Sequence, residues 1–170
     1  RAHSNAYLKV AKFFDLPLEP VMHTVLARNP EETQAFADRW GWHNASTDSA
    51  ATINNDEIDL VDVTTPNNAH AELSIAALEA GKHVACEKPL ANTLDNARQM
   101  KEAAEKASGK TFVWYNYRRC PAVAFAHQLC KAGKLGKIYQ IRCCYLQDWE
   151  GPTTPLMSRF QGEVAGSDSQ

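Results

Sequence analysis

Short apolar segments alternate with helical patterns along most of this chain, and this alternation limits what it can fold into more than any other feature. We expect strands at 21–27, 58–63, 84–86 and 111–115, and helices at 3–14, 30–40, 46–53, 68–80, 93–108 and 120–132. Strands that alternate with helices form βαβ units, in which successive strands run parallel. The sequence therefore predicts an α/β fold built on a doubly wound parallel sheet.

Capping residues and glycines mark several of the expected helix ends. Asn29 can cap the helix at 30–40, and Gly41 follows that helix. Thr93 or Asn92 can cap the helix at 93–108. These positions predict helix boundaries from local chemistry alone.

The pattern changes in the last third of the chain. Residues 138–147 are expected to form a long strand with no helix after it. Parallel strands need a crossover, so a long strand without a following helix is more typical of an antiparallel sheet. We therefore expect two domains: a parallel-sheet domain over 1–118, and over 119–170 the start of an α+β domain with an antiparallel sheet.

Composition argues against several functional classes. The chain has 170 residues, with 18 basic and 20 acidic side chains, so its overall charge offers no basic field for nucleic acid or a membrane surface. No apolar run approaches the ~18 residues of a membrane-spanning helix. Five cysteines without a Cys-x-x-Cys pair favour reduced thiols and argue against a zinc knuckle. We therefore expect a cytoplasmic protein with no metal, nucleic-acid or membrane partner.

Polar turns that contain a proline follow two successive strands. Glu87-Lys88-Pro89 comes directly after the strand at 84–86, and Thr65-Pro66-Asn67 follows the strand at 58–63, with His70 three residues further on. In an open α/β sheet, ligands bind just outside the carboxyl ends of the strands. Lys88 therefore lies where chemistry is expected, on a turn that a proline stiffens.

These two strand ends, Thr-Pro-Asn-x-x-His followed by Glu-Lys-Pro, resemble those of the Gfo/Idh/MocA family of nicotinamide-dependent sugar and polyol dehydrogenases. The resemblance covers roughly residues 1–149. It implies a Rossmann-like domain, NAD or NADP as cofactor, a sugar or polyol as substrate, and a homo-oligomer formed through the C-terminal sheet. Two alternatives remain open: a non-catalytic binding or regulatory protein on the same scaffold, and an inactive fragment that folds by oligomerising.

The resemblance implies roles for the residues of the two turns. Lys88 would be the catalytic residue, placed near the nicotinamide and the substrate hydroxyl, whereas the alternative is an ordinary surface lysine. The cofactor-binding set would include Thr65, Pro66, Asn67, His70 and Glu87. A structural carboxylate remains open for Glu87, and a capping or packed histidine remains open for His70.

Further binding residues follow other strands. Arg28 and Asn29 come after the strand at 21–27, where the resembled family often has an acid at the position of Ala27, and this tilts the cofactor slightly towards NADP. Asn116 would support the nicotinamide carboxamide. The substrate set would comprise Lys88, Tyr117, Gln147 and Trp149, and an ordinary core role remains open for Trp149.

The resemblance also implies segments that are not seen in this sequence. A strand and a glycine-rich phosphate loop would precede Arg1, so the sheet would have a gap with unpaired edges on both sides. Near the other end, Asp168 lacks the histidine that follows the aspartate of the resembled family. Both domains are therefore expected to be incomplete.

Overall fold

A computed structural model describes residues 1–146, 148 and 161–166 of the chain. The strands are β1 Thr24–Leu26, β2 Asn44–Ser46, β3 Leu60–Val63, β4 His83–Cys86 and β5 Thr111–Val113. The α-helices are α1 Ala2–Lys9, α2 Pro30–Trp40, α3 Ser49–Ile53, α4 His70–Glu79, α5 Leu94–Lys106, α6 Pro121–Lys131 and α7 Gly162–Ala165. Short 3₁₀ turns are η1 Val10–Lys12, η2 Asn67–Ala69 and η3 Asn116–Arg119.

The described strands form two separate parallel sheets. One pairs β1 with β2, and the other has the order β3-β4-β5. The predicted parallel α/β architecture is confirmed, and so is the predicted gap, because β1 and β3 are not bonded to each other within the described part of the chain.

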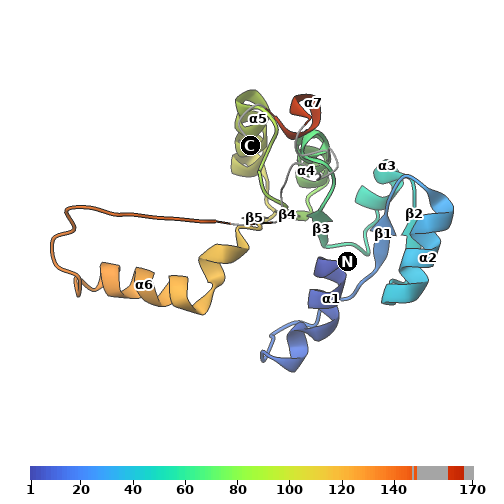
Figure 1. Ribbon diagram of the computed structural model, residues 1–170. Helices are drawn as coiled ribbons and strands as arrows, with labels where there is room; N and C mark the ends of the chain where they lie inside the picture. Colours follow the sequence, from blue (N-terminus) through green and yellow to red (C-terminus); the bar gives the residue numbers. More distant parts are fainter. Residues whose placement is uncertain (147, 149–160, 167–170) are drawn as a thin grey trace.

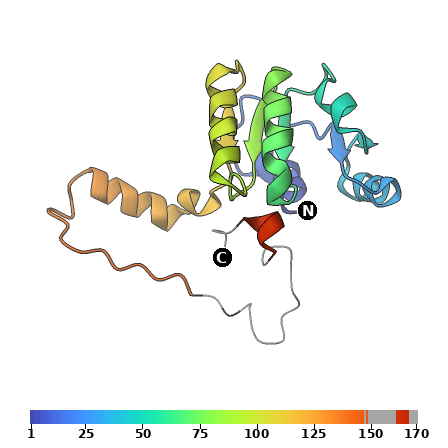
Figure 2. The same cartoon turned by 90° about the horizontal axis from the view of Figure 1, so that it is seen from above.

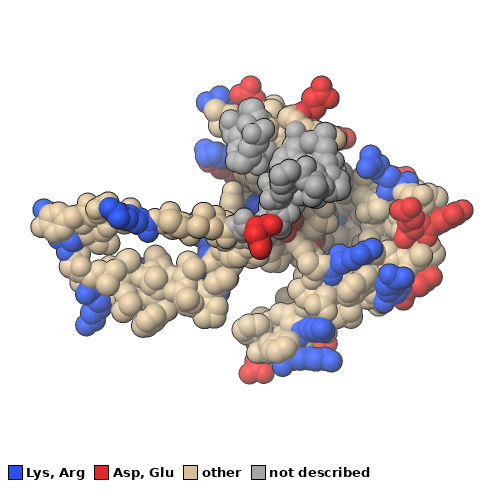
Figure 3. Space-filling model, in the orientation of Figure 1, with Lys and Arg blue, Asp and Glu red and all other residues tan. Residues whose placement is uncertain are grey.

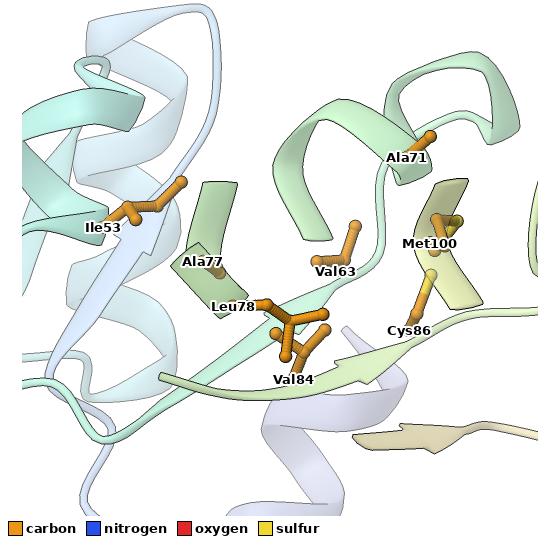
Figure 4. Packing of buried hydrophobic residues seen from close by; sticks show 8 residues of the cluster. All are labelled: Ile53, Val63, Ala71, Ala77, Leu78, Val84, Cys86 and Met100. Carbon is orange, nitrogen blue, oxygen red and sulfur yellow. The ribbon is translucent and has the colours of Figure 1, made fainter. Parts of the chain in front are cut away.

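The main core lies on one face of the three-stranded sheet. Figure 1 shows α4 and α5 side by side above this sheet and α1 on the opposite side. Figure 4 shows the buried cluster, whose members come from β3, β4, α3, α4 and α5: Ile53, Val63, Ala71, Ala77, Leu78, Val84, Cys86 and Met100. This packing holds the carboxyl ends of the strands in a fixed arrangement.

The predicted caps are present. The Asn29 side chain accepts a hydrogen bond from the Glu32 amide at 3.0 Å, and the Thr93 hydroxyl accepts one from the Asn96 amide at 3.2 Å. Gly41 ends α2 with a φ of 75°, a left-handed conformation that glycine adopts without strain. Local chemistry therefore sets these helix ends.

Two sequence expectations were wrong. Residues 44–46 form the strand β2, where only a helix at 46–53 was expected, because this short polar segment is recognisable only by its pairing with β1. Residues 138–146 form no strand, since they have no hydrogen-bonded neighbour among the described strands, and residue 147 lies outside the described residues.

Residues 121–146, which we call the arm, project away from both sheets (Figures 1 and 2). The arm consists of α6 and the extended segment after it. No described helix is long and apolar enough to cross a membrane.

Candidate functional site at the carboxyl ends of the strands

The register of the three-stranded sheet brings its strand ends level with one another. Val63 pairs with Cys86, and Cys86 pairs with Val113. The Glu87 amide donates to the Val63 carbonyl at 2.9 Å, and the Trp114 amide donates to the Cys86 carbonyl at 2.9 Å. The polar turns that follow β3, β4 and β5 therefore lie along one edge of the sheet, as the sequence predicted.

His70 joins the first two of these turns. Its side chain is 0% exposed, its Nδ1 lies 3.0 Å from the Pro89 carbonyl oxygen, and its Nε2 lies 2.8 Å from the Thr65 carbonyl oxygen. Because both ring nitrogens face backbone carbonyls, the arrangement favours a packed histidine. Any influence of His70 on a bound molecule would act through the position of the two turns.

The turn after β3 retains one polar group without a partner. The Thr65 hydroxyl is buried and makes no hydrogen bond with the described residues. The neighbouring Asn67 side chain donates to the Ala165 carbonyl at 3.1 Å and so connects the turn to α7. A buried hydroxyl of this kind is a candidate contact for a ligand.

The turn after β4 presents Lys88 to solvent. The Lys88 side chain is exposed and has no hydrogen-bond or ion-pair partner among the described residues. One Glu87 carboxylate oxygen accepts from the Lys88 backbone amide at 2.8 Å, and the other lies 3.0 Å from Nε2 of His3. Glu87 therefore holds the turn, while the Lys88 amine remains available.

A hydrogen-bonded cluster lies behind these turns and was missed from the sequence. Asp62 accepts from Tyr7 at 2.9 Å and from the Trp114 indole at 2.8 Å, and it lies 2.7 Å from Nδ1 of His3. Burial and the charge of Asp62 raise the pKa of Tyr7. The available signal was Asp62 itself, a charged residue inside the apolar strand Leu60–Val63.

His3 is the titratable centre of this cluster. Burial lowers the pKa of its imidazole, but hydrogen bonds and charges from Asp62 and Glu87 outweigh burial and raise the pKa above the ordinary value of 6.5. A protonated His3 would therefore persist to a higher pH than a free histidine.

A second feature lies at the end of β1, on the other sheet. An open hollow of about 450 Å³ is lined by Val25, Ala27, Arg28, Asn29, Glu32, Thr33 and Phe36. Arg28 is exposed, and the Asn29 side chain is already engaged in capping α2. The structure therefore places both predicted residues beside a hollow at a strand end.

The remaining predicted residues lie after β5 or outside the described residues. The Asn116 side chain accepts from the Tyr117 amide at 2.9 Å, and both residues are exposed. The Tyr117 hydroxyl lies 2.5 Å from the Tyr145 hydroxyl of the arm, with the two rings edge to face. Gln147, Trp149 and Asp168 lie outside the described residues.

These features fit a dinucleotide laid across the strand ends. Among the described residues, the buried Thr65 hydroxyl and the exposed Lys88 amine have no partner, and the end of β1 is hollowed beside Arg28. Among residues 1–146, 148 and 161–166, no group of three His, Cys, Asp or Glu side chains could hold a metal ion. The arrangement can therefore bind an anionic or polyhydroxylated molecule next to a free amine.

Comparisons with known proteins agree with this geometry. The model of the oxidoreductase family with an NAD-binding Rossmann fold, Gfo/Idh/MocA, matches residues 2–116. Levoglucosan dehydrogenase of Pseudarthrobacter phenanthrenivorans is 43% identical over 169 residues, which cover 98% of this chain and 43% of that protein. The 1,5-anhydro-D-fructose reductase of Ensifer adhaerens is 32% identical over 114 residues, which cover 67% of this chain and 34% of that protein.

Comparisons with solved structures also find oxidoreductases. A levoglucosan dehydrogenase in complex with NADH and levoglucosan superimposes with a TM-score of 0.93 at 43% identity, covering 98% of this chain and 45% of that chain. An oxidoreductase domain protein from Kribbella flavida superimposes with a TM-score of 0.93 at 46% identity. This match covers 98% of this chain and 45% of that chain. This chain therefore spans less than half the length of these relatives. Because the family model matches well over half of its residues, the chain belongs to the Gfo/Idh/MocA oxidoreductase family and carries its NAD-binding Rossmann fold.

Proposed function

We propose that this chain forms the nucleotide-binding part of an NAD-dependent dehydrogenase that acts on a carbinol carbon of a sugar or polyol. The observation that carries the proposal is Lys88, an exposed amine with no partner in the described part of the chain, on the strand-end turn beside Thr65. The relatives named for anhydro-sugar substrates support a sugar of that class as the first candidate.

Lys88 would handle the hydroxyl side of the reaction. When the alcohol is oxidised, the uncharged amine accepts the hydroxyl proton while a hydride leaves the carbinol carbon, and in the reverse direction the ammonium returns that proton. The bound nicotinamide supplies the carbon that accepts or donates the hydride. Glu87 fixes the backbone of the turn through its bond to the Lys88 amide, so that the amine is presented from a defined position.

The cofactor would lie along the strand ends. Thr65, Pro66, Asn67 and Asn116 follow β3 and β5 and would contact the nicotinamide half, whereas Arg28 and Asn29 beside the hollow at β1 would contact the adenosine half. Relatives solved with NADH support NAD over the slight preference for NADP that Ala27 and Arg28 suggested. Tyr117, Gln147 and Trp149 remain proposed substrate contacts.

The proposed setting is a cytoplasmic homo-oligomer that uses the 119–170 region. Unpaired thiols at Cys86, Cys120, Cys130, Cys143 and Cys144 are consistent with a reducing compartment. Large apolar side chains are exposed on the arm, among them Phe125 and Ile141, and support a role of this region in association. The two proposed domains meet near residue 118.

The test is the variant Lys88→Ala in the protein that contains this chain, assayed with NAD and sugars that include levoglucosan and L-sorbose. We expect turnover to fall by a factor of about 10² or more with little change in NAD affinity, the usual size for loss of a positioned proton-transfer group. Lys101→Ala, on the exposed face of α5, is the matched control and should keep wild-type turnover.

Each outcome separates the alternatives. Unchanged turnover in Lys88→Ala would remove this amine from the mechanism and favour a non-catalytic binding protein. A lost circular dichroism spectrum would assign Lys88 a structural role instead.

A further inference from the structure

The cluster behind the strand ends connects α1 to the turn that carries Lys88. His3 and Tyr7 come from α1, Asp62 from β3, and Trp114 from the residue after β5. Asp62 contacts all three of the other side chains, so its carboxylate is held from several directions. This network plays no part in the function proposed above.

His3 lies between two carboxylates. Its Nδ1 is 2.7 Å from Asp62, and its Nε2 is 3.0 Å from Glu87. A carboxylate can only accept, so both bonds form together only when both ring nitrogens carry a proton. The geometry therefore describes an imidazolium bridge between one strand interior and one strand-end turn.

The bridge continues into the backbone of the turn. The second Glu87 oxygen accepts from the Lys88 amide at 2.8 Å, so an unbroken series of hydrogen bonds runs from Asp62 through His3 and Glu87 to Lys88. We propose that His3 is a positioning residue whose protonated ring, through Glu87, sets the orientation of the turn that presents Lys88. This proposal rests on the proposed function, in which Lys88 is the proton-transfer group.

Loss of one ring proton from His3 would break one hydrogen bond of this series, the bond between His3 and Glu87. Because Tyr7 and Trp114 fix the Asp62 carboxylate beside Nδ1, we expect the remaining ring proton on Nδ1, with Asp62 as its acceptor. The bare Nε2 lone pair then faces the Glu87 carboxylate, and the two repel. Glu87 is 31% exposed and can turn towards solvent, which releases the Lys88 amide.

The groups around His3 determine the direction of the pH response. Asp62 faces the ring from β3, Glu87 from the end of β4, and Tyr7 reaches the same Asp62 oxygen from α1. The uncharged Trp114 ring packs edge to face against His3 at 5.1 Å. The net effect raises the pKa of His3, so the turn is held below that raised pKa while both carboxylates are ionised, and it is released as pH rises through that pKa.

The test follows two atoms by NMR in the full-length protein. The His3 ring is observed with labelled histidine and the Lys88 amide with 15N-lysine, and the Lys88 signal is assigned with Lys88→Arg. We expect the Lys88 amide shift to change with the same midpoint as His3, above pH 6.5. An amide shift that stays flat across the His3 midpoint would overturn the proposal.

The variant His3→Gln should abolish this transition of the Lys88 amide. Turnover should fall about tenfold, the size expected from a misplaced catalytic group, while the KM for NAD changes by less than about twofold. His23→Gln is the matched control, because His23 also lies near a carboxylate, Glu57 at 3.3 Å, but precedes β1 at the opposite end of the strands. This control should leave the transition and turnover unchanged.

A second variant keeps the test decisive if His3→Gln does not fold. In Glu87→Gln the His3 midpoint should fall, and the Lys88 amide should no longer follow it, because the carboxylate that connects them is gone. A His3 midpoint equal to that of the wild type would contradict the bridge. If the wild type shows no dehydrogenase activity, the proposed function fails, whereas the NMR titration still decides the role of His3.

Discussion

Apolar side chains are buried on the three-stranded sheet but exposed on the arm. In the sheet, Val63 and Val84 are buried in one cluster with Leu78 of α4 (Figure 4). On the arm, Phe125, Ile141 and Leu146 are exposed, and no residue of α6 is buried. The difference teaches that burial in this chain comes from crossover helices that return over their strands, and the arm has no such cover among the described residues.

Charge is divided between the same two regions. Figure 3 shows Lys and Arg on the projecting arm with no red residue among them, whereas both signs are mixed over the rest of the visible surface. The sequence contains no Asp or Glu between Glu105 and Asp148. The near-balanced total of 18 basic and 20 acidic residues therefore conceals a locally basic segment.

The strongest test of this difference in burial is a leucine-to-alanine substitution made in each of the two regions. Leu78→Ala removes a side chain that is 4% exposed and should lower the free energy of unfolding by about 3 kcal/mol, through lost burial and the cavity left behind. Leu146→Ala, at a position 90% exposed, should change it by less than about 0.5 kcal/mol. Urea unfolding of both variants measures the difference.

Equal losses of unfolding free energy in the two variants would contradict this difference in burial. They would mean that Leu146 is buried in solution, for instance against another copy of the chain. Sedimentation of the Leu146→Ala protein would then detect a change in association state.

Thiol reactivity also tests the difference in burial between the two regions, with a smaller expected effect. Cys86 is buried, and burial raises the pKa of its thiol, with added contributions from the charges of Glu87 and Asp62. Cys143 and Cys144 are exposed on the arm. Because the thiolate is the reactive form, we expect Cys86 to be alkylated at least about tenfold more slowly than the arm cysteines.

Mass spectrometry of iodoacetamide-treated protein reads this difference directly. The three thiols should react alike once the protein is unfolded in urea. Rapid labelling of native Cys86 would show that the core beneath β4 opens readily.

The smallest expected effect concerns helix caps in the two regions. Thr93→Ala removes the hydroxyl that accepts from the Asn96 amide at the start of α5 and should cost about 1 kcal/mol. Cys120 makes no such bond at the start of α6, so Cys120→Ala should change stability by less than about 0.5 kcal/mol. Thermal unfolding compares the pair, and equal costs would show that the Thr93 cap does not stabilise α5.

Much of the fold was predictable because its signals are local. The caps at Asn29 and Thr93 and the strands ending before Thr65 and Glu87 follow from residue type and spacing, and the structure contains them. The strand β2 was not predictable, since Asn44–Ser46 has neither apolar alternation nor length and depends on pairing with β1. Of the strand expected at 138–147, residues 138–146 form none, because they have no neighbouring strand among the described residues to pair with.

The candidate site likewise has one part that local sequence predicts and another that depends on tertiary structure. The sequence by itself determined that two polar turns end neighbouring parallel strands and that Lys88 lies on one of them, because strand direction and turn chemistry are encoded within a few residues. Only the tertiary structure decided that His3 meets Asp62 and Glu87, which are 59 and 84 positions away along the chain. Contacts over such separations depend on how α1 packs on the sheet, and no local pattern specifies that packing.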